Sequence, residues 1–417
     1  MRLGDHHVIV VDLGFGDAGK GATVDWLCAN GSVSAVVRFN GGAQAAHNVI
    51  ADDRHHRFAQ FGSGSLADTA TLLSRHMLVE PIALAAESVE LARLGVADPL
   101  SLLHIDGDAL LTTPLHVAAN RAREDARGAA RHGSCGRGIG ETAAYALQHR
   151  APRVADCRDA GLLTRLLDDL TRHYEPLIGD RIGSIGELVA LYREFAAAVR
   201  ITGSDALASF AARGRLVFEG AQGVLLDEWR GLHPHTTWST VEPRNARAMI
   251  ADLGERPFVL GVTRTYLTRH GAGPFPTEDP GLTLPEPHNA TGEYQGAFRV
   301  GHFDPILLRY AVEACGGVDG LAVTHLDQRA GVRSAVAYLT EDGVIDEVHC
   351  GPWRDLAYQE RLTRQLGSAQ PVLEDLPADA ADAIAARLGV PVVLTSGGPD
   401  RADRVPRLPT SAVGTAG

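Results

Sequence analysis

The residues best suited to chemistry stand near the start of the chain, in a glycine-rich loop. The loop Gly14-Phe-Gly-Asp-Ala-Gly-Lys-Gly21 follows an apolar, β-branched run from His7 to Leu13 and precedes a segment, Ala22–Leu27, that suits the start of a helix. A loop between a buried strand and a helix points backbone N–H groups and the positive end of the helix dipole at one spot. The stretch therefore predicts a phosphate-binding site.

Two motifs overlap in this loop, and they imply different ligands. Gly14, Gly16 and Gly19 match the G-x-G-x-x-G fingerprint of dinucleotide sites, whereas Gly14, Gly19 and Lys20 match the G-x-x-x-x-G-K loop of nucleoside triphosphatases. A dinucleotide site expects an acid about 20 residues further on. The second predicted strand carries Arg38 instead, which at best fits a phosphorylated cofactor.

The triphosphate interpretation is favoured, because Lys20 has a role beside β- and γ-phosphates but none in a dinucleotide site. The triphosphate interpretation departs from its motif at Gly21, which replaces the Ser or Thr whose hydroxyl holds Mg²⁺. Asp17, inside the loop, could hold the metal instead. A phosphorylated-dinucleotide oxidoreductase stays open as the rival interpretation at this point.

Around the loop, short apolar runs alternate with longer segments that are apolar on one side, which is typical of an α/β protein. Strands are predicted at 34–39, 70–73, 102–106 and 320–327, a strand that runs into a glycine turn at 216–227, and helices at 83–94, 162–170 and 186–192. A chain of 417 residues is long enough for one large α/β domain or two ordinary ones. The last residues have weak patterning, which predicts a loose tail.

The composition narrows the class of protein. Charged residues at 22% and hydrophobic ones at 45% are typical of a soluble globular protein, and the net charge of −12 argues against general nucleic-acid binding. No apolar run approaches the ~20 residues of a membrane helix, and the N-terminus does not resemble a signal peptide. The five cysteines are far apart, which predicts reduced thiols in the cytoplasm and no disulfide framework or zinc site.

These motifs have counterparts in a known family. The loop Gly14–Gly21 resembles the G-x-W-G-D-E-G-K-G loop of adenylosuccinate synthetase, and later segments resemble that family in the same order from residue 7 to about 401. The resemblance implies an α/β fold with one large domain over 1–401, built on a central, mostly parallel sheet, a phosphate-loop-like nucleotide-binding core and helical insertions. It leaves 402–417 as the expected tail.

The resemblance also implies an activity. Members of the family are GTP-dependent carbon–nitrogen ligases that phosphorylate the 6-oxygen of IMP and let an amine, aspartate in the parent reaction, displace the phosphate to give adenylosuccinate. The implied partners are GTP, IMP or a close 6-oxopurine nucleotide, an amino acid or amine, one Mg²⁺ per subunit and a second subunit in a homodimer, without nucleic acid or membrane. Two alternatives stay open: a specialised paralogue that joins a different amine or nucleotide, and a non-catalytic nucleotide-binding regulator.

On the GTP side, the resemblance assigns roles residue by residue. Asp17 corresponds to the general base and a Mg²⁺ ligand, and His47 to a histidine that contacts the transferring γ-phosphoryl group. Ala46 stands for a glycine whose carbonyl meets Mg²⁺. Asp327, at the end of a predicted strand, is expected to accept the N1–H and 2-amino protons of guanine, which adenine lacks. The implied catalytic residues are Asp17, Lys20 and His47, and the implied GTP-binding residues are Gly16, Asp17, Ala18, Gly19, Lys20, Gly21, Ala46, His47, Asn48, His325, Leu326, Asp327, Ser396, Gly397 and Gly398.

The resemblance assigns a second set of residues to the nucleotide that is aminated. Ser134 and Cys135 replace the two threonines that bind its 5′-phosphate in the family loop T-T-G-R-G-I-G-P, and a thiol is a poorer donor than a hydroxyl. An arginine that the family lends across its dimer interface falls at His149 or Arg150, and the alignment does not choose between them. The implied residues for this nucleotide are Gln44, Ser134, Cys135, His149, Arg150, Gln222 and Thr237.

The segment Thr291–Asp304 departs most from the family. The family has T-T-G-R-R-R-R-T-G-W-x-D, whose arginines grip the dicarboxylate of aspartate; here only Arg299 remains, and Gly296-Ala-Phe298 occupies the other places. Planar Arg–carboxylate pairing is the usual way to hold such a substrate, and each lost charge-assisted hydrogen bond is worth ~1.5–3 kcal/mol. Either Arg299 and Arg269 hold aspartate alone, or the amine is different and less acidic.

Overall fold

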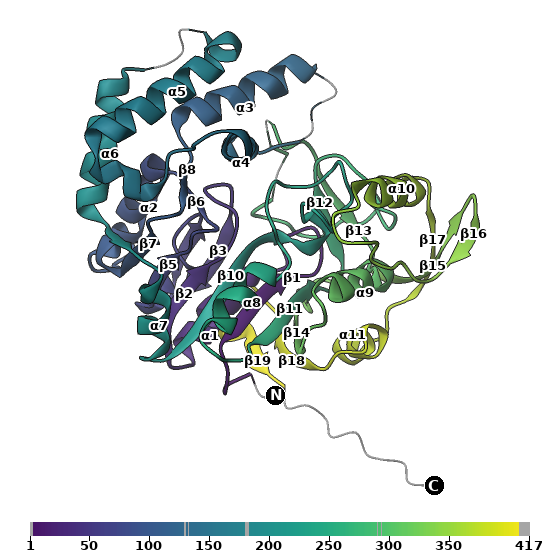
Figure 1. The fold of residues 1–417 in the computed structure, drawn as a ribbon. Coiled ribbons are helices and arrows are strands. Elements are labelled where there is room, and N and C mark those ends of the chain that lie inside the picture. Colours follow the sequence, from purple (N-terminus) through teal and green to yellow (C-terminus); the bar gives the residue numbers. More distant parts are fainter. Residues whose placement is uncertain are drawn as a thin grey trace.

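A ten-stranded sheet runs through the middle of the molecule (Figure 1). The computed structural model describes residues 3–128, 131, 133–179, 183–289, 291–292 and 294–407. In spatial order the strands are β19 (Arg404–Pro406), β18 (Val392–Ser396), β14 (Gly320–Thr324), β11 (Phe258–Arg264), β1 (Val8–Asp12), β10 (Arg215–Gly223), β2 (Val33–Arg38), β5 (Ala70–Leu73), β7 (Leu103–Asp106) and β9 (Arg200–Thr202). All neighbours are parallel except β18 and β19, so the predicted mostly parallel sheet is confirmed.

The central strand β1 is buried on both faces, which explains why its sequence is apolar without alternation. Val8 and Val10 join a core with Val24 of helix α1 (Lys20–Ala29), whereas Ile9 and Val11 point into the largest core on the opposite face. The polypeptide then leaves the sheet at its carboxyl edge. In open parallel sheets, ligands bind outside this edge.

Ten further helices pack on the sheet or form a separate helical part beside β5 and β7 (Figure 1). In the described residues they are α2 (Pro81–Arg93), α3 (Pro114–Arg127), α4 (Ile139–Gln148), α5 (Ala160–Ile178), α6 (Ile185–Ala198), α7 (Asp205–Ala211), α8 (Arg244–Ala251), α9 (Pro305–Ala314), α10 (Leu356–Gly367) and α11 (Ala380–Leu388). The helices predicted within α2, α5 and α6 are confirmed, as are helical insertions. None of the helices in the described residues is long and apolar enough to span a bilayer.

Four small sheets complete the fold of the described residues. They are the hairpin β3 (His47–Ala51) with β4 (Arg54–Phe58), the pair β6 (Leu78–Val79) and β8 (Leu110–Leu111), the pair β12 (Leu267–His270) and β13 (Phe298–Gly301), and the three-stranded sheet of β15 (Arg333–Thr340), β16 (Gly343–Ile345) and β17 (Gln370–Asp375). The antiparallel pair β12–β13, called here the donor hairpin, sets Arg269 opposite Arg299 and His270 opposite Phe298.

The chain stays within the sheet beyond residue 401, so the predicted start of the tail is too early. Strand β19 pairs with Leu394–Ser396, and Arg401 binds both carboxylate oxygens of Asp25 at 2.7 Å. A three-residue edge strand with polar neighbours carries almost no periodic signal, which is why the sequence pattern missed it. The remainder of the predicted tail, 408–417, lies outside the described residues.

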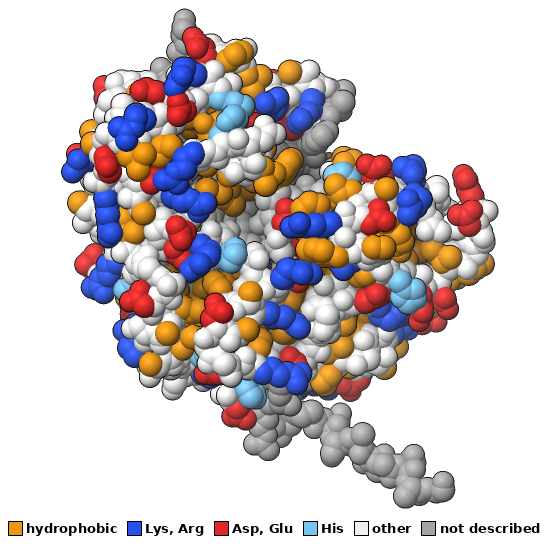
Figure 2. Space-filling model, viewed as in Figure 1, with side chains coloured by type: hydrophobic (Ala, Val, Ile, Leu, Met, Phe, Trp, Pro, Cys, Tyr) orange, Lys and Arg blue, Asp and Glu red, His pale blue; other side chains and the backbone are white. Residues whose placement is uncertain are grey.

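The surface is hollowed between the helical part and the part that carries α9 and α10 (Figure 2). Acidic and basic side chains are interspersed over the face shown, without one dominant sign of charge.

Candidate active site

The glycine-rich loop is folded around a buried carboxylate, that of Asp12 at the end of β1. One oxygen, Oδ1, accepts a hydrogen bond from the Gly14 N–H at 2.9 Å. The other, Oδ2, accepts from the Ala18 N–H at 2.9 Å and lies 3.2 Å from Lys20 Nζ. Asp12 is not among the predicted site residues; the available signal was an acid at the end of an apolar strand, directly before the glycines.

The loop also presents a second carboxylate, that of Asp17. Gly16, Asp17 and Gly19 all have positive φ, of 114°, 61° and 89°, so the loop turns through left-handed conformations that glycine adopts freely. The Asp17 Oδ2 lies 3.3 Å from His270 Nε2. Burial alone would raise the pKa of Asp17, but contact with His270 and the nearby charges of Arg264 and Lys20 lower it, so this carboxyl is ionised at neutral pH.

His47 is the first residue of β3 and is oriented by an acid on β10. Its Nδ1 lies 2.7 Å from Oε1 of Glu219, which is fully buried and also accepts from the N–H of Ser63 at 2.9 Å. Burial of Glu219 would raise its pKa, but His47, Arg38 and Ser63 lower the pKa to about 2. The contact fixes the tautomer of the ring and leaves Nε2 for a ligand.

A third group of residues comes from the ends of β14 and β18. The Thr324 hydroxyl lies 2.8 Å from Nδ1 of His325, and the Leu326 N–H donates to the Ser396 carbonyl at 3.1 Å, which ties the two loops together. Burial, with the charges of Arg264 and Arg404, holds the pKa of His325 well below its usual value, so its ring is neutral. Asp327 is exposed at the end of this loop.

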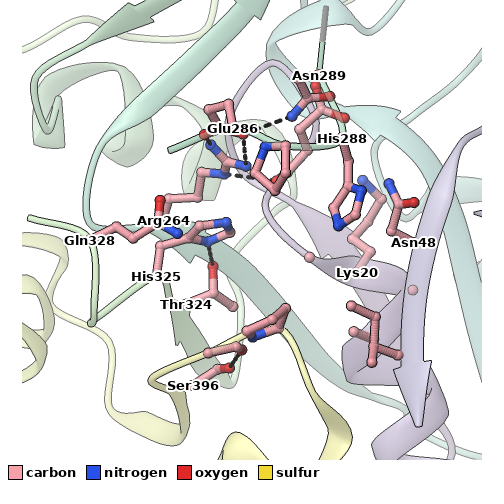
Figure 3. A pocket seen from close by; sticks show the side chains of 18 of the residues that line it. Lys20, Asn48, Arg264, Glu286, His288, Asn289, Thr324, His325, Gln328 and Ser396 are labelled. Atoms are coloured by element: carbon pink, nitrogen blue, oxygen red, sulfur yellow. Dashed lines mark hydrogen bonds and ion pairs between the residues drawn. The ribbon is translucent and has the colours of Figure 1, made fainter. Parts of the chain in front are cut away.

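These three groups line one pocket of about 180 Å³ (Figure 3). The pocket contains eleven of the predicted GTP-binding residues: Asp17, Gly19, Lys20, Gly21, Ala46, His47, Asn48, His325, Asp327, Ser396 and Gly398. The other four, Gly16, Ala18, Leu326 and Gly397, are their chain neighbours and do not line it. The fold of the described residues thus brings together segments that lie more than 300 positions apart in sequence.

The pocket has one wall that sequence analysis missed, the segment Pro285–Asn289. Glu286 pairs with both terminal nitrogens of Arg264 and accepts from Asn289 Nδ2 at 2.8 Å (Figure 3). It also accepts from the Tyr266 hydroxyl at 2.6 Å. No motif marks this segment. Its position depends on a strand more than 20 residues earlier, so no local pattern could have revealed it.

The predicted residues for the aminated nucleotide fall into two groups. Gln44 and Gln222 stand near the end of the sheet, where Asn40 and Ala221 hydrogen-bond each other in both directions at 3.1 and 2.8 Å. Both amide atoms of Gln44 and the Oε1 of Gln222 are buried without a hydrogen-bond partner in the described residues. Such atoms are costly unless a ligand satisfies them. The Thr237 N–H donates to the Leu226 carbonyl at 2.9 Å.

The other predicted residues of this set lie outside that group. The Ser134 hydroxyl accepts from Asn120 Nδ2 at 2.9 Å, and burial raises the pKa of Cys135, which keeps it a thiol. His149 is exposed at the end of α4, stacked on Tyr145 at 4.5 Å, and Arg150 is exposed and paired with Asp156 at 2.9 Å. The structure does not bring these two residues to the pocket of their own chain.

Both arginines of the donor hairpin are bound to protein groups. Arg269 is 1% exposed, and its Nε, Nη1 and Nη2 donate to the carbonyls of Ala272, Pro274 and His235 at 3.2, 2.9 and 3.4 Å. Burial, and then the charge of Arg299, lower the pKa of Arg269 to about 9. Arg299 donates to Glu278 Oε2 at 2.8 Å and to the Gly273 carbonyl at 2.9 Å.

Comparisons with known proteins agree with this arrangement. The family model described as adenylosuccinate synthetase matches residues 9–405. Similar curated proteins include adenylosuccinate synthetases of Acidithiobacillus ferrooxidans, 37% identical over 97% of this chain and 99% of that protein, and of a Marinomonas strain, 32% identical over 96% and 98%. The chain belongs to the adenylosuccinate synthetase family. It is therefore a member of a family of GTP-hydrolysing carbon–nitrogen ligases.

Solved structures share the fold. The fully ligated adenylosuccinate synthetase of Plasmodium falciparum has a TM-score of 0.81 at 22% identity and covers 97% of this chain and 100% of its own. The succinoaminodeoxyadenylate synthetase of cyanophage S-2L, bound to dGMP and dATP, has a TM-score of 0.61 at 19% identity over 96% and 95%. The predicted family and α/β fold are confirmed.

Proposed function

We propose that this chain uses GTP to activate the 6-oxygen of IMP or a close 6-oxopurine nucleotide and then joins an amine to C6. With aspartate as the amine, the parent reaction of the family, the product is adenylosuccinate. The observation that carries the proposal is the single pocket in which Asp17, Lys20, His47 and Asp327 meet. Family membership supplies the reaction type, and the pocket supplies groups suited to a guanine nucleotide.

The residues divide the chemistry between them. Asp17, which is ionised and lines the pocket, takes the N1 proton of the purine, which makes the 6-oxygen nucleophilic toward the γ-phosphorus. The P–O bond to the 6-oxygen forms as the bond between the γ-phosphorus and the bridging oxygen breaks, and GDP leaves with the bond electrons. Lys20, Nε2 of His47 and the loop N–H groups stabilise the charge on the transferring phosphoryl group. The lone pair of the amine then attacks C6, the C6–O bond breaks, phosphate leaves with the bond electrons, and the amine nitrogen loses a proton.

Mg²⁺ fits the pocket. Magnesium is usually held by one or two carboxylates with substrate phosphates and water. Asp17 provides one carboxylate, and Ala46 lines the same pocket. No group of three or more His, Cys, Asp or Glu residues in the described ranges could hold a metal alone, so the phosphates must complete the shell. When bound there, the ion offsets negative charge on the β- and γ-oxygens; Asp17 and the Ala46 carbonyl are its proposed ligands.

Two further assignments belong to this proposal. Asp327 accepts the N1–H and 2-amino protons of guanine, with the neutral ring of His325 beside the base. Gln44 and Gln222 bind the second nucleotide, which is supported by their unpaired buried amide atoms. We also propose a cytoplasmic homodimer in which His149 or Arg150 reaches the partner's site; both are exposed on this subunit.

Positional isotope exchange tests the proposed function directly. GTP labelled with ¹⁸O in the β,γ-bridge is mixed with the protein and Mg²⁺, with or without IMP and without any amine. Reversible phosphoryl transfer frees the β-phosphate to rotate, so the label is expected to scramble only when IMP is present. Binding of GTP without any exchange in the presence of IMP would identify a regulator and overturn the proposal.

A further inference from the structure

A side chain outside the pocket contacts the carboxylate of the proposed base. His270, the last residue of β12, places its Nε2 3.3 Å from Oδ2 of Asp17. Asp17 lines the pocket and His270 does not, so the imidazole meets the carboxylate from outside the pocket. In the part of the chain that the structure describes, no other side chain donates to this carboxylate or forms an ion pair with it.

The backbone around Asp17 is held by other groups. Nε of Arg264 donates to the Asp17 carbonyl at 2.8 Å, and the Thr324 hydroxyl donates to the Ala18 carbonyl at 2.9 Å. The φ of Asp17 is 61°, in a region that is uncommon for a residue with a side chain. These contacts fix the place of the backbone, but the rotation of the carboxylate depends on its contact with His270.

The donor hairpin fixes the imidazole ring in turn. His270 pairs with Phe298 across the two strands, and their ring centroids lie 4.9 Å apart. The next residue, Gly271, has a φ of 73° and donates its N–H to the Ala297 carbonyl at 2.9 Å. A Cβ on Gly271 would lie 2.6 Å from the Gln295 carbonyl oxygen, so the two strands close tightly directly after His270.

Packing alone does not explain an imidazole at this position. Its other ring nitrogen, Nδ1, is buried without a hydrogen-bond partner in the described residues. Such an atom destabilises the folded state, and an apolar side chain that packed on Phe298 would avoid that cost. The contact that an apolar side chain could not make is the one between Nε2 and Asp17.

The contact leaves acceptor sites on Asp17 for a ligand. An N–H at Nε2 is present in the cationic ring and in one neutral tautomer, so His270 donates to Oδ2 in either form. A carboxylate has about four acceptor sites on its two oxygens, so the remaining sites stay available to the purine N1–H and to Mg²⁺. Catalytic hydrogen bonds are often long before the substrate binds and tighten in the complex.

From this geometry we infer that His270 is a positioning residue for the proposed base. Its Nε2–H donates to Oδ2 of Asp17 and thereby turns Oδ1 toward the N1–H of the purine. The inference rests on the proposed function, in which Asp17 takes that proton. A displacement of about 1 Å can cost roughly 100-fold in rate, so loss of the contact should slow phosphoryl transfer without weakening the binding of either nucleotide.

Three variants at this position test the inference. His270→Gln places an amide nitrogen near the position of Nε2, His270→Asn places one near that of Nδ1, and His270→Leu has no donor. Each full-length protein is given bridge-labelled GTP, Mg²⁺ and increasing IMP, and the rate of positional isotope exchange within GTP is measured. We expect the maximal rate to fall about 10- to 100-fold in the Leu and Asn variants and to stay within about 3-fold of wild type in the Gln variant.

Two further readouts separate positioning from a structural role. The half-saturating concentrations of GTP and IMP are expected to stay within about 2-fold of wild type in all three variants, because binding is not affected. Melting temperatures are recorded for each variant, and His349→Leu, at an exposed position that does not line the pocket, is the control expected to keep the wild-type rate. Rates that simply followed stability across the variants would assign His270 a structural role and overturn the inference.

Two other outcomes would also overturn it: a wild-type maximal rate in the Leu variant, or a Gln variant no faster than the Asn variant. Both are read against the wild-type protein, which must itself show exchange that depends on IMP. If the wild type shows none, the proposed function is wrong and the inference falls with it. If the wild type shows exchange, either outcome removes only the role given to His270.

Discussion

The triphosphate pocket and the donor hairpin use their cations in opposite ways. In the pocket, Asp12 contacts Lys20 and Glu219 contacts His47. Each acid orients its basic partner through one donor and leaves the other donors of that partner for the ligand. In the hairpin, Arg269 and Arg299 turn into carbonyls and Glu278. A basic residue in a matching motif can therefore bind a ligand only through the N–H groups that its protein partners leave available.

Asp17→Asn gives the largest expected effect, because it removes the base while keeping the shape of the loop. We expect the rate of positional isotope exchange within GTP, measured in the presence of IMP, to fall roughly 10²- to 10⁴-fold. Exchange is followed by ³¹P NMR, and GTP affinity is measured on the same variant by titration. If exchange continued at the wild-type rate, the base would have to be another group.

Glu219 tests the support behind His47. Its pKa of about 2 lies below the ordinary value of 4.5, so its stabilising effect is complete above about pH 4.5 and is lost as the pH falls toward 2. The effect amounts to roughly 3 kcal/mol. We expect Glu219→Gln to flatten the loss of unfolding free energy between about pH 5 and pH 3, measured by urea titration. Glu341→Gln, at an exposed site, is the control and should keep the wild-type slope.

Asp327 tests whether the far end of the pocket reads guanine. Asp327→Asn exchanges an acceptor for an amide donor, so we expect kcat/KM for GTP to fall about 100-fold and that for XTP, which has an oxygen at C2, to rise. Steady-state rates with the two nucleotides measure the switch. An unchanged preference for GTP would remove Asp327 from the base site.

Arg269 gives the smallest expected effect, on stability. A lysine cannot reach three carbonyls, so Arg269→Lys is expected to lower the unfolding free energy by about 2 kcal/mol. Arg57→Lys, at an exposed position, is the matched control. A loss of donor binding in the Lys variant without any loss of stability would show that Arg269 contacts the substrate after all.

The sequence predicted what depends on local pattern. The apolar run around Ile9, which does not alternate with polar residues, predicted a strand buried on both faces. The glycines up to Gly19 predicted the loop after it. The partners of the functional residues depend on long-range contacts: Glu219 lies 172 positions from His47. Asp12, Glu286 and the edge strand β19 were missed because no short motif or periodicity encodes which distant loops meet at the carboxyl edge of a sheet.

The most direct measurement is a crystal structure with a non-hydrolysable GTP analogue, IMP and Mg²⁺. It is predicted to place the guanine edge on Asp327 and the γ-phosphate between Lys20 and His47, with Asp17 facing N1 of IMP. A triphosphate bound elsewhere, or an analogue whose terminal phosphate lies away from Asp17, would contradict the central claim that this one pocket carries the phosphoryl transfer.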